Sequence, residues 1–465
     1  MLKFWGELAP GERDLLANQV DSIGWQELPR LIEQYVNNKP TFALPPDVQP
    51  APYYPVDHRA SFRPWDKDAA RTKGEELLRN GKVAAFVVAG GQGSRLGYEG
   101  PKGCYPAGAV TGKPLFAMFA DAILGAHDRY GVHVPWYIMT SPLNHDATLE
   151  FFAAHHFFGL PRNTVCFLMQ GVMPSLEISS GRVLMASKAE IATNPDGHGG
   201  SLRALQASGA LEDMRRRGVS TISYFQVDNA IVNLLDPVFL GLHAGAGGES
   251  SGQMSSKMIP KAYAEEKLGV FCAHGAGPRK GRVEIVEYSD LPMDLQREKL
   301  PDGRLRFLSG SIAVHVLGRE FVERLNTDAA FELPWHRAEK KIPCIDMASG
   351  EAVKPASNNG VKLERFVFDA LPLCERSVVL ETDRIEEFAP IKNAEGQDSP
   401  QSCSEIQTER AARWLEYCGV DVPRTADGKP DCVLEISART ASTREELKAG
   451  GRLPRAIERG QRLAM

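Results

Sequence analysis

Residues 87–103 read Val87-Val88-Ala89-Gly90-Gly91-Gln92-Gly93-Ser94-Arg95-Leu96-Gly97-Tyr98-Glu99-Gly100-Pro101-Lys102-Gly103. The apolar, β-branched run 83–89 predicts a buried strand that leads into this segment. The glycines allow the backbone N–H groups to converge on one point, where no Cβ hinders a phosphate chain. Arg95 offers a planar fork for phosphate oxygens, and Lys102 adds a point charge. The segment therefore indicates a loop that holds a nucleoside triphosphate.

Two other phosphate-binding loops compete with this interpretation. The glycines at 91, 93 and 97 are spaced one residue wider than in the dinucleotide-binding fingerprint, which also requires a helix to begin at the loop. Here glycines and prolines interrupt the chain after residue 97, and helical periodicity begins only near 115–127. No G-K-[ST] triplet is present in the segment, so a P-loop is excluded.

The rest of the chain predicts alternating strands and helices. We expect strands at 132–140, 164–170 and 221–227, a series of short strands over 280–325, and helices at 69–79, 115–127, 146–156, 202–217 and 405–417. This alternation favours an α/β fold with a mixed, mostly parallel sheet flanked by helices. We predict a helical N-terminal segment over 1–80, a catalytic domain over 81–390 and a small C-terminal domain over 391–465.

Composition restricts the function classes. The 465 residues are 43% hydrophobic and 24% charged, with a net charge of −5, which is typical of a soluble globular protein and argues against a general nucleic-acid binder. No apolar stretch reaches membrane-spanning length, and the N-terminus shows no signal-peptide pattern. The eight cysteines are scattered without a C-x-x-C pair, as expected of reduced thiols in a cytoplasmic protein.

Other segments carry possible chemistry. Asp228 follows the predicted strand 221–227, at the edge where α/β sheets bind ligands, and suits a Mg²⁺ ion that bridges phosphates; a turn or helix cap is the alternative. The glycine-rich loop 194–202 permits close approach of a ring or phosphate, or is a plain connection. Lys362 and Lys392 are, by residue type alone, most often solvated surface side chains.

The ordered set of these segments resembles the eukaryotic-type UDP-sugar pyrophosphorylases, and within them the UDP-N-acetylhexosamine pyrophosphorylases. The resemblance runs from about residue 80 to 395. The matching segments are 89–97, 101–103, 139–141, 167–170, 195–200, 227–229, 236–237, 286–289, 340–343, 362–369 and 384–393.

The resemblance implies a Rossmann-like (GT-A-like) nucleotidyltransferase fold and a Mg²⁺-dependent reaction of UTP with a sugar 1-phosphate that gives UDP-sugar and pyrophosphate. It places Arg95, Lys102 and Lys392 in phosphate transfer and Asp228 on the metal. It assigns uridine nucleotide binding to Ala89, Gly90, Gly91, Gln170, Gly197 and Lys362. It assigns sugar binding to His198, Glu287, Tyr288 and Ser311. We expect a monomer or homodimer without nucleic-acid or membrane partners.

The sugar contacts depart from the hexosamine pattern. That pattern has Asn where this chain has His198, as in the glucose and broad-specificity relatives, and Gly-Asn-Ile where this chain has Gly310-Ser311-Ile312. Three hypotheses therefore stay open: a uridylyltransferase for N-acetylglucosamine 1-phosphate, a glucose-specific or broad-specificity UDP-sugar pyrophosphorylase, and a non-catalytic uridine-nucleotide-binding protein. The residues leave the preferred sugar undecided.

Overall fold

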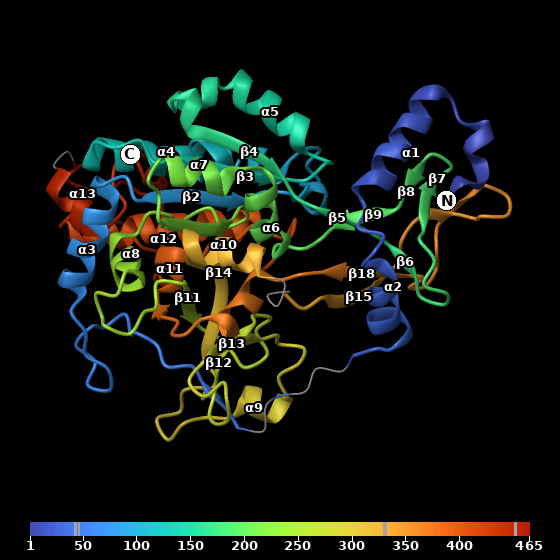
Figure 1. The fold of residues 1–465 in the computed structure, drawn as a ribbon. Helices are drawn as coiled ribbons and strands as arrows, with labels where there is room; N and C mark the ends of the chain where they lie inside the picture. Colours follow the sequence, from blue (N-terminus) through green and yellow to red (C-terminus); the bar gives the residue numbers. More distant parts are fainter. Residues whose placement is uncertain (41–43, 45–46, 329–332, 451–452) are drawn as a thin grey trace. The chain divides into compact units, whose positions relative to one another are not determined.

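The computed structural model describes residues 1–40, 44, 47–328, 333–450 and 453–465, and its ribbon is shown in Figure 1. The chain forms two compact units. The smaller comprises Met1–Leu44, Gln170–Ala204 and Ala330–Asp369; the larger comprises Pro45–Met169, Leu205–Ala329 and Ala370–Met465. The boundaries predicted near residues 80 and 390 do not coincide with those of the units, because each unit gathers separate parts of the chain. They remain predictions about which segments fold as separate domains.

A block of four adjacent parallel strands forms one half of the ten-stranded sheet in the larger unit. Its order is β4-β3-β2-β10, with bounds Val165–Met169, Trp136–Thr140, Val83–Val88 and Thr221–Gln226. Each strand was predicted from its apolar run. Because the strands are parallel, their carboxyl ends meet at one edge of the sheet, and the glycine-rich loop and Asp228 both follow strands that end there.

The other half of the sheet is largely antiparallel. Strand β14 (Ser309–Gly318) pairs antiparallel with β10, β11 and β12, and the sheet continues through β1 and β13, while β19 pairs parallel with β11. The bounds are β11 Met254–Pro260, β12 Val270–His274, β1 Val48–Pro50, β13 Val283–Val286 and β19 Val379–Glu381. The sheet is therefore mixed, and its mainly parallel character holds only for the first half.

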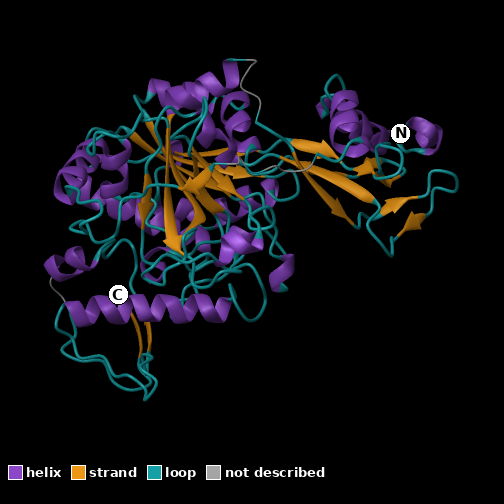
Figure 2. Ribbon diagram, turned by 90° about the horizontal axis from the view of Figure 1, so that it is seen from below, coloured by secondary structure: helices purple, strands orange, loops and turns teal. Residues whose placement is uncertain are grey.

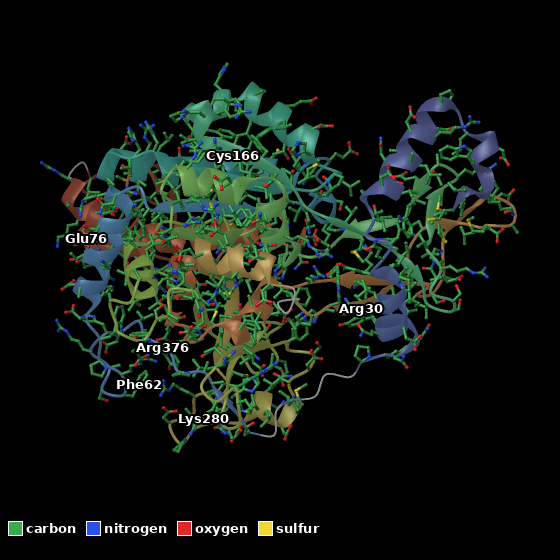
Figure 3. All side chains as sticks on the ribbon, viewed as in Figure 1. Arg30, Phe62, Glu76, Cys166, Lys280 and Arg376 are labelled. Atoms are coloured by element: carbon green, nitrogen blue, oxygen red, sulfur yellow. The ribbon has the colours of Figure 1, made fainter. Side chains whose placement is uncertain are left out.

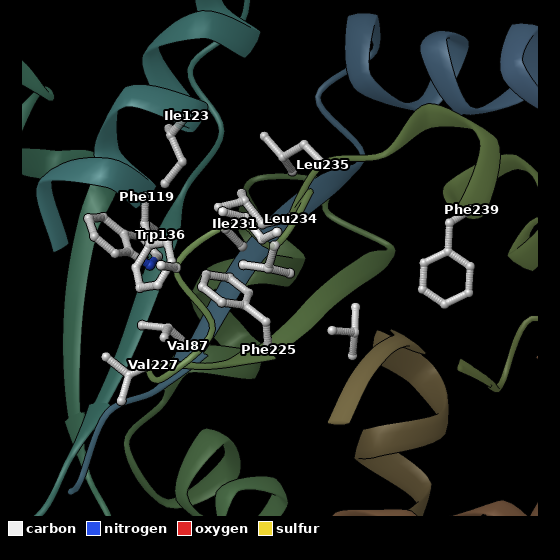
Figure 4. Packing of buried hydrophobic residues seen from close by; sticks show 14 of the residues in the cluster. Val87, Phe119, Ile123, Trp136, Phe225, Val227, Ile231, Leu234, Leu235 and Phe239 are labelled. Atoms are coloured by element: carbon white, nitrogen blue, oxygen red, sulfur yellow. The ribbon is translucent and has the colours of Figure 1, made fainter. Parts of the chain in front are cut away.

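Helices lie on both faces of the central strands (Figure 2). Val83, Ala85 and Val87 of β2 share one buried cluster with residues of α3 (Lys67–Arg79), α4 (Leu115–Tyr130) and α8 (Pro237–His243). Figure 4 shows Phe119 of α4 packed near Trp136 of β3 in that cluster. On the opposite face, the Tyr137 hydroxyl donates to Asp213 of α7 (Ala210–Arg216) at 2.7 Å.

Two local predictions need correction. The helix expected over 202–217 is two helices, α6 (Gly200–Ala207) and α7, because Gly209 between them adopts φ +77°, outside the helical region. The segment 280–325 holds only two strands, β13 and the ten-residue β14, together with the helices α9 (Met293–Arg297) and α10 (Arg319–Thr327). Its alternating apolar residues are divided between one long strand and one face of α10.

The remaining elements of the larger unit are α5 His145–Ala154, α11 Arg384–Glu387, α12 Pro400–Tyr417, α13 Arg444–Gly450, β20 Val433–Glu435 and β21 Arg462–Ala464. The smaller unit contains α1 Pro10–Ser22, α2 Leu28–Leu31, β5 Val172–Pro174, β6 Leu176–Glu177, β7 Met185–Ser187, β8 Glu190–Ile191, β9 Thr193–Pro195, β15 His336–Lys340, β16 Cys344–Ile345, β17 Ala352–Val353 and β18 Gly360–Glu364. Exposed charged side chains such as Glu76, Lys280 and Arg376 lie at the edge of the larger unit (Figure 3). Among the described residues, no helix has both the length and the apolar content to cross a membrane.

Candidate active site

The glycine-rich loop after β2 is held by two polar side chains that follow β3. Asn144 donates from Nδ2 to the carbonyl oxygens of Ala89 at 2.9 Å and Gly91 at 3.2 Å, and the Ser141 hydroxyl donates to that of Gly90 at 2.9 Å. In a trans peptide the N–H points opposite to the C=O. The N–H groups of Gly90 and Gly91 therefore point away from these side chains, as a loop that binds anions requires. Asn144 was missed from the sequence because it belongs to no recognised motif.

The glycines of this loop serve different purposes. A Cβ at Gly103 would lie 2.2 Å from the Phe116 ring, and one at Gly93 would lie 2.7 Å from the Tyr98 ring, so packing requires both glycines. A Cβ at Gly91 would meet no described atom within 4 Å. The glycine at 91 thus leaves open space beside the backbone, where a ligand can approach.

Four charged residues of the larger unit form one electrostatic cluster. Burial lowers the pKa of Lys102; Asp228 opposes this shift, whereas Lys392 and Arg95 add to it. These influences place Arg95, Asp228 and Lys392 within electrostatic range of Lys102. The Lys102 N–H also donates to the Gly91 carbonyl oxygen at 3.1 Å, which fastens the lysine to the glycine-rich loop. Residues far apart in sequence thus converge at the carboxyl edge of the sheet.

Lys392 lies in a tight turn closed by Asp398. The carbonyl oxygen of Asp398, a residue with φ +57°, accepts the N–H groups of Lys392 at 2.6 Å and Asn393 at 3.0 Å. The Lys392 Nζ also lies 3.9 Å from a carboxylate oxygen of Asp398. Burial raises the pKa of Asp398, Lys392 lowers it, and Asp228 raises it, so Asp398 lies within electrostatic range of both residues. Sequence reasoning missed Asp398, because its role depends on a turn that no motif marks.

The Asp228 carboxylate is suited to hold a metal ion together with phosphates. It is half-buried, and within the described part of the chain it has no hydrogen-bond or ion-pair partner. The described residues contain no group of three or more His, Cys, Asp or Glu side chains placed to bind a metal. Mg²⁺ commonly takes one or two protein carboxylates and completes its shell with phosphate oxygens and water. This donor set fits that ion.

Two of the predicted sugar residues of the larger unit, Glu287 and Ser311, lie beside Gly269. The Ser311 N–H donates to the Gly269 carbonyl oxygen at 2.8 Å, and a Cβ at Gly269 would lie 3.2 Å from a Glu287 carboxylate oxygen. Tyr288 is 37% exposed, and its carbonyl oxygen accepts from the Gln296 amide at 2.9 Å. Glu287 and Tyr288 directly follow β13, Ser311 lies on β14, and Gly269 directly precedes β12.

A cavity of about 250 Å³ in the larger unit connects this region with the Lys392 turn. Its lining includes Leu268, next to Gly269, and both Asn393 and Asp398 of the turn. The residues that line the cavity are thus chain neighbours of Gly269 and of Lys392, whereas Lys392, Glu287, Tyr288 and Ser311 are not among them.

Gln170 and the loop 195–200 form a second group, in the smaller unit. The Gln170 Nε2 donates to the Gly197 carbonyl oxygen at 2.8 Å. This bond occupies an amide hydrogen and leaves the Gln170 Oε1 as an acceptor for a ligand N–H. Asp196, which the sequence analysis did not select, is 6% exposed, and burial raises its pKa to about 6 although Gln170 and Arg365 lower it.

His198 has a defined protonation state in the same loop. Its Nδ1 accepts the Val367 N–H at 3.1 Å, so the proton of the neutral ring lies on Nε2. The ring stacks on Phe366 with centroids 5.1 Å apart, and burial lowers the pKa of His198 to about 4. His198 is therefore a neutral side chain with one N–H donor. Lys362 lies on β18, four residues before Phe366.

The glycines of this loop are required by packing against the segment after β18. Gly197 has φ +84°, and its Cβ would lie 2.3 Å from the Arg365 carbonyl oxygen. A Cβ at Gly199 would lie 2.7 Å from the backbone of Arg365 and Phe366. The glycine pattern predicted close approach of a ring or phosphate to this loop. The group that approaches Gly197 and Gly199 in the structure is the backbone of Arg365 and Phe366.

Comparison with known proteins identifies the family of this chain. The pattern of the family described as UTP--glucose-1-phosphate uridylyltransferase matches residues 30–398. UDP-N-acetylglucosamine diphosphorylase 2 of Arabidopsis thaliana is 33% identical over 468 residues, with 97% of this chain and 88% of that protein covered. UDP-N-acetylglucosamine pyrophosphorylase of Saccharomyces cerevisiae is 31% identical over 457 residues, with coverage of 95% and 92%.

A solved structure shares the fold. The crystal structure of the uridine diphosphate N-acetylglucosamine pyrophosphorylase from Trypanosoma brucei, in complex with an inhibitor, matches with a TM-score of 0.78 at 24% identity. The match covers 95% of this chain and 90% of that one. The mixed sheet with flanking helices is therefore the fold of a known enzyme structure.

Proposed function

This chain belongs to the UTP–glucose-1-phosphate uridylyltransferase family and is a UDP-sugar uridylyltransferase; from that premise we propose that it makes UDP-N-acetylglucosamine and pyrophosphate from UTP and N-acetylglucosamine 1-phosphate. The observation that carries the proposal is identity of 31–33% over nearly the whole chain to proteins named for UDP-N-acetylglucosamine.

The reaction is an in-line displacement at phosphorus. An oxygen of the sugar 1-phosphate attacks the α-phosphorus of UTP, and the bond from that phosphorus to the β-phosphate oxygen breaks, so pyrophosphate leaves. The attacking oxygen is already ionised at neutral pH, and no general base is needed. The enzyme's contribution is to position two polyanions and neutralise their charge.

The charged cluster of the larger unit suits this task. Arg95 and Lys102 are assigned to the β- and γ-phosphates, where they neutralise the leaving pyrophosphate. Lys392 is assigned to the α-phosphoryl group and the incoming sugar phosphate. Lys362, in the smaller unit, is assigned separately to the nucleotide. The lowered pKa of Lys102, caused by burial and by the neighbouring cations, is what a site built for additional anions would produce.

Asp228 is assigned to Mg²⁺. When bound, the ion supplies charge neutralisation between phosphate oxygens. The half-buried carboxylate without a described partner supports this role.

The nucleotide base and ribose are assigned to Ala89, Gly90, Gly91, Gln170 and Gly197. The Gln170 Oε1, left free by the bond from Nε2 to Gly197, can accept the N3–H of uracil, whereas N3 of cytosine carries no proton. The N–H groups of Gly90 and Gly91 are available for the base carbonyls.

A glucose-specific or broad-specificity enzyme is the second candidate. His198 presents one N–H donor and no free acceptor, because its Nδ1 accepts the Val367 N–H. The Asn of the hexosamine pattern offers both a donor and an acceptor. Ser311 likewise has a short hydroxyl where the hexosamine pattern has an amide. Two of the four assigned sugar contacts therefore differ from that pattern, and the other two, Glu287 and Tyr288, match it.

The deciding experiment measures pyrophosphate release from UTP and Mg²⁺ with a panel of sugar 1-phosphates. The panel contains N-acetylglucosamine, N-acetylgalactosamine, glucose, galactose and glucuronate. We expect the highest kcat/KM with N-acetylglucosamine 1-phosphate. Preference for glucose or galactose would favour the second candidate, and no release with any sugar, while UTP still binds, would contradict catalysis.

A further inference from the structure

A buried lysine connects the two segments that carry Asp228 and Lys392. Lys257 on β11 is 1% exposed. Its Nζ lies 2.8 Å from a carboxylate oxygen of Asp236 and also contacts a carboxylate oxygen of Glu387. Burial lowers the pKa of Lys257, but the two carboxylates outweigh burial and raise it, so the ammonium stays charged.

The two segments are also joined by hydrogen bonds, two of them made by the Asn229 side chain. The Asn229 Nδ2 donates to the Glu387 carbonyl oxygen at 2.7 Å, and its Oδ1 accepts the Ala389 N–H at 3.0 Å. The Ile391 N–H donates to the Asp228 carbonyl oxygen at 2.9 Å. The residue after Asp228 and the residue before Lys392 are therefore both fixed to the opposite segment.

Each carboxylate of the buried cluster has a second bond to the Asp228 segment. The second carboxylate oxygen of Glu387 accepts the Asn233 N–H at 3.0 Å. The other carboxylate oxygen of Asp236 accepts the Val238 N–H at 2.9 Å and caps α8. The positive charge of Lys257 thus holds together carboxylates that order residues 229–238 and 387–391.

Lys257 occupies an irregular position in the sheet. The pairing of β11 with β14 shifts between Ser256 and Met258, on either side of the lysine. Bulges of this kind commonly re-aim a side chain next to an active site. Here the re-aimed side chain is the one that reaches Asp236 and Glu387.

A contribution to stability does not explain why the protein buries these three charges together. Removing three charges from water costs more than their attraction commonly returns, and apolar replacements are often neutral or stabilising. We propose that Lys257 is a positioning residue for the reaction proposed above. With Asp236 and Glu387, it keeps Asp228 and Lys392 at the spacing that the metal-bound triphosphate and the sugar phosphate require. This inference rests on the proposed function.

The test compares Lys257→Met with a matched control, Ser256→Ala. Ser256 is the fully buried neighbour on the same strand, and its hydroxyl bonds to His315 Nδ1 at 2.8 Å, outside the proposed site. We expect Lys257→Met to lower kcat about 10- to 100-fold, as loss of a residue that orients catalytic groups commonly does. The half-saturating Mg²⁺ concentration and the KM for the sugar 1-phosphate should rise, whereas Ser256→Ala should leave all three constants near wild type.

A double-mutant cycle separates positioning from a general loss of structure. If Lys257 acts through Lys392, Lys257→Met should add little to the loss caused by Lys392→Gln; independent effects would multiply. Should Lys257→Met fail to fold, Asn229→Ala provides the same comparison, since it removes only the Glu387 and Ala389 bonds.

Three outcomes are decisive. The first is an active wild type together with a folded Lys257→Met or Asn229→Ala enzyme whose half-saturating Mg²⁺ concentration and KM for the sugar 1-phosphate are unchanged. That result would overturn the positioning role but not the proposed function. Multiplicative effects in the cycle would also overturn the positioning role. A wild-type enzyme that releases no pyrophosphate from any sugar 1-phosphate would overturn the proposed function and this inference together.

Discussion

Asp228 is the single residue on which the proposed metal dependence rests. Asp228→Ala removes the one side chain assigned to the ion, so we expect Mg²⁺-dependent pyrophosphate release to fall at least about 100-fold, as for loss of other preorganised electrostatic groups. The exposed Asp302, which pairs with Arg304, supplies a control variant, Asp302→Ala, that should keep wild-type turnover. Circular dichroism checks that both variants fold. Substantial Mg²⁺-dependent activity in Asp228→Ala would remove the residue from the site.

Asp196 should make stability depend on pH. Burial raises its pKa from 3.8 to about 6 in the folded protein, so the folded state resists ionisation. Below about pH 4 the carboxyl is neutral in both states and costs nothing; above about pH 6 the full cost, at most about 3 kcal/mol, is present. Relative to Asp196→Asn, the wild type should therefore lose free energy of unfolding as the pH rises from about 4 to 7. Urea denaturation at pH 4 and pH 7 measures the free energy of unfolding of the wild type and of Asp196→Asn. If the two proteins differ by the same amount at both pH values, Asp196 does not ionise in a buried site.

At the scale of the element, the loop 195–200 depends on glycine for two reasons, which substitution can separate. Gly209, between α6 and α7, has φ +77° but open space around its Cβ position, so Gly209→Ala should cost about 1–2 kcal/mol of stability from backbone strain alone. Gly197 has a similar φ, and its Cβ would also collide with the Arg365 carbonyl oxygen. Gly197→Ala should therefore cost more and should also raise the KM for UTP, because it displaces the oxygen that orients Gln170. Equal losses of stability, with unchanged KM in both variants, would contradict this account.

At the scale of the whole molecule, the C-terminal segment is fastened to the loop that leads from Lys102 to α4. The buried Glu435 accepts the Val110 and Thr111 N–H groups at 2.8 and 2.9 Å and the Thr111 hydroxyl at 2.7 Å. Glu435→Gln removes the negative charge, so the charge-assisted bonds to the Val110 and Thr111 N–H groups become weaker neutral ones, at a cost of about 1 kcal/mol. Hydrogen exchange should quicken at residues 107–113 and 433–435, but not in the exposed control Glu458→Gln. Unchanged exchange in the first variant would show that Glu435 does not fasten the two segments.

Several features of this protein could be predicted because they are local. An apolar, β-branched run predicts a buried strand from its own residues, and β2, β3, β4 and β10 formed where their runs predicted. The predicted α/β class is confirmed, and so is the uridylyltransferase family implied by the ordered motifs. The assignments of Arg95, Lys102, Asp228 and Lys392 to the reaction remain predictions.

The central strands and the glycine-rich loop after β2 were predictable because each depends on residues close together in the chain, and the ordered motifs along the chain indicated the uridylyltransferase family. The pairs of distant groups became visible in the folded chain: Asn144 with the glycine-rich loop, Asp398 with Lys392, and Lys257 with Asp236 and Glu387. The folded chain also shows that half of the sheet is antiparallel and that the smaller unit combines three separate segments. Buried charges and amide groups bind to whichever element folding brings alongside them, and such long-range pairings leave no periodic or spaced pattern in the chain.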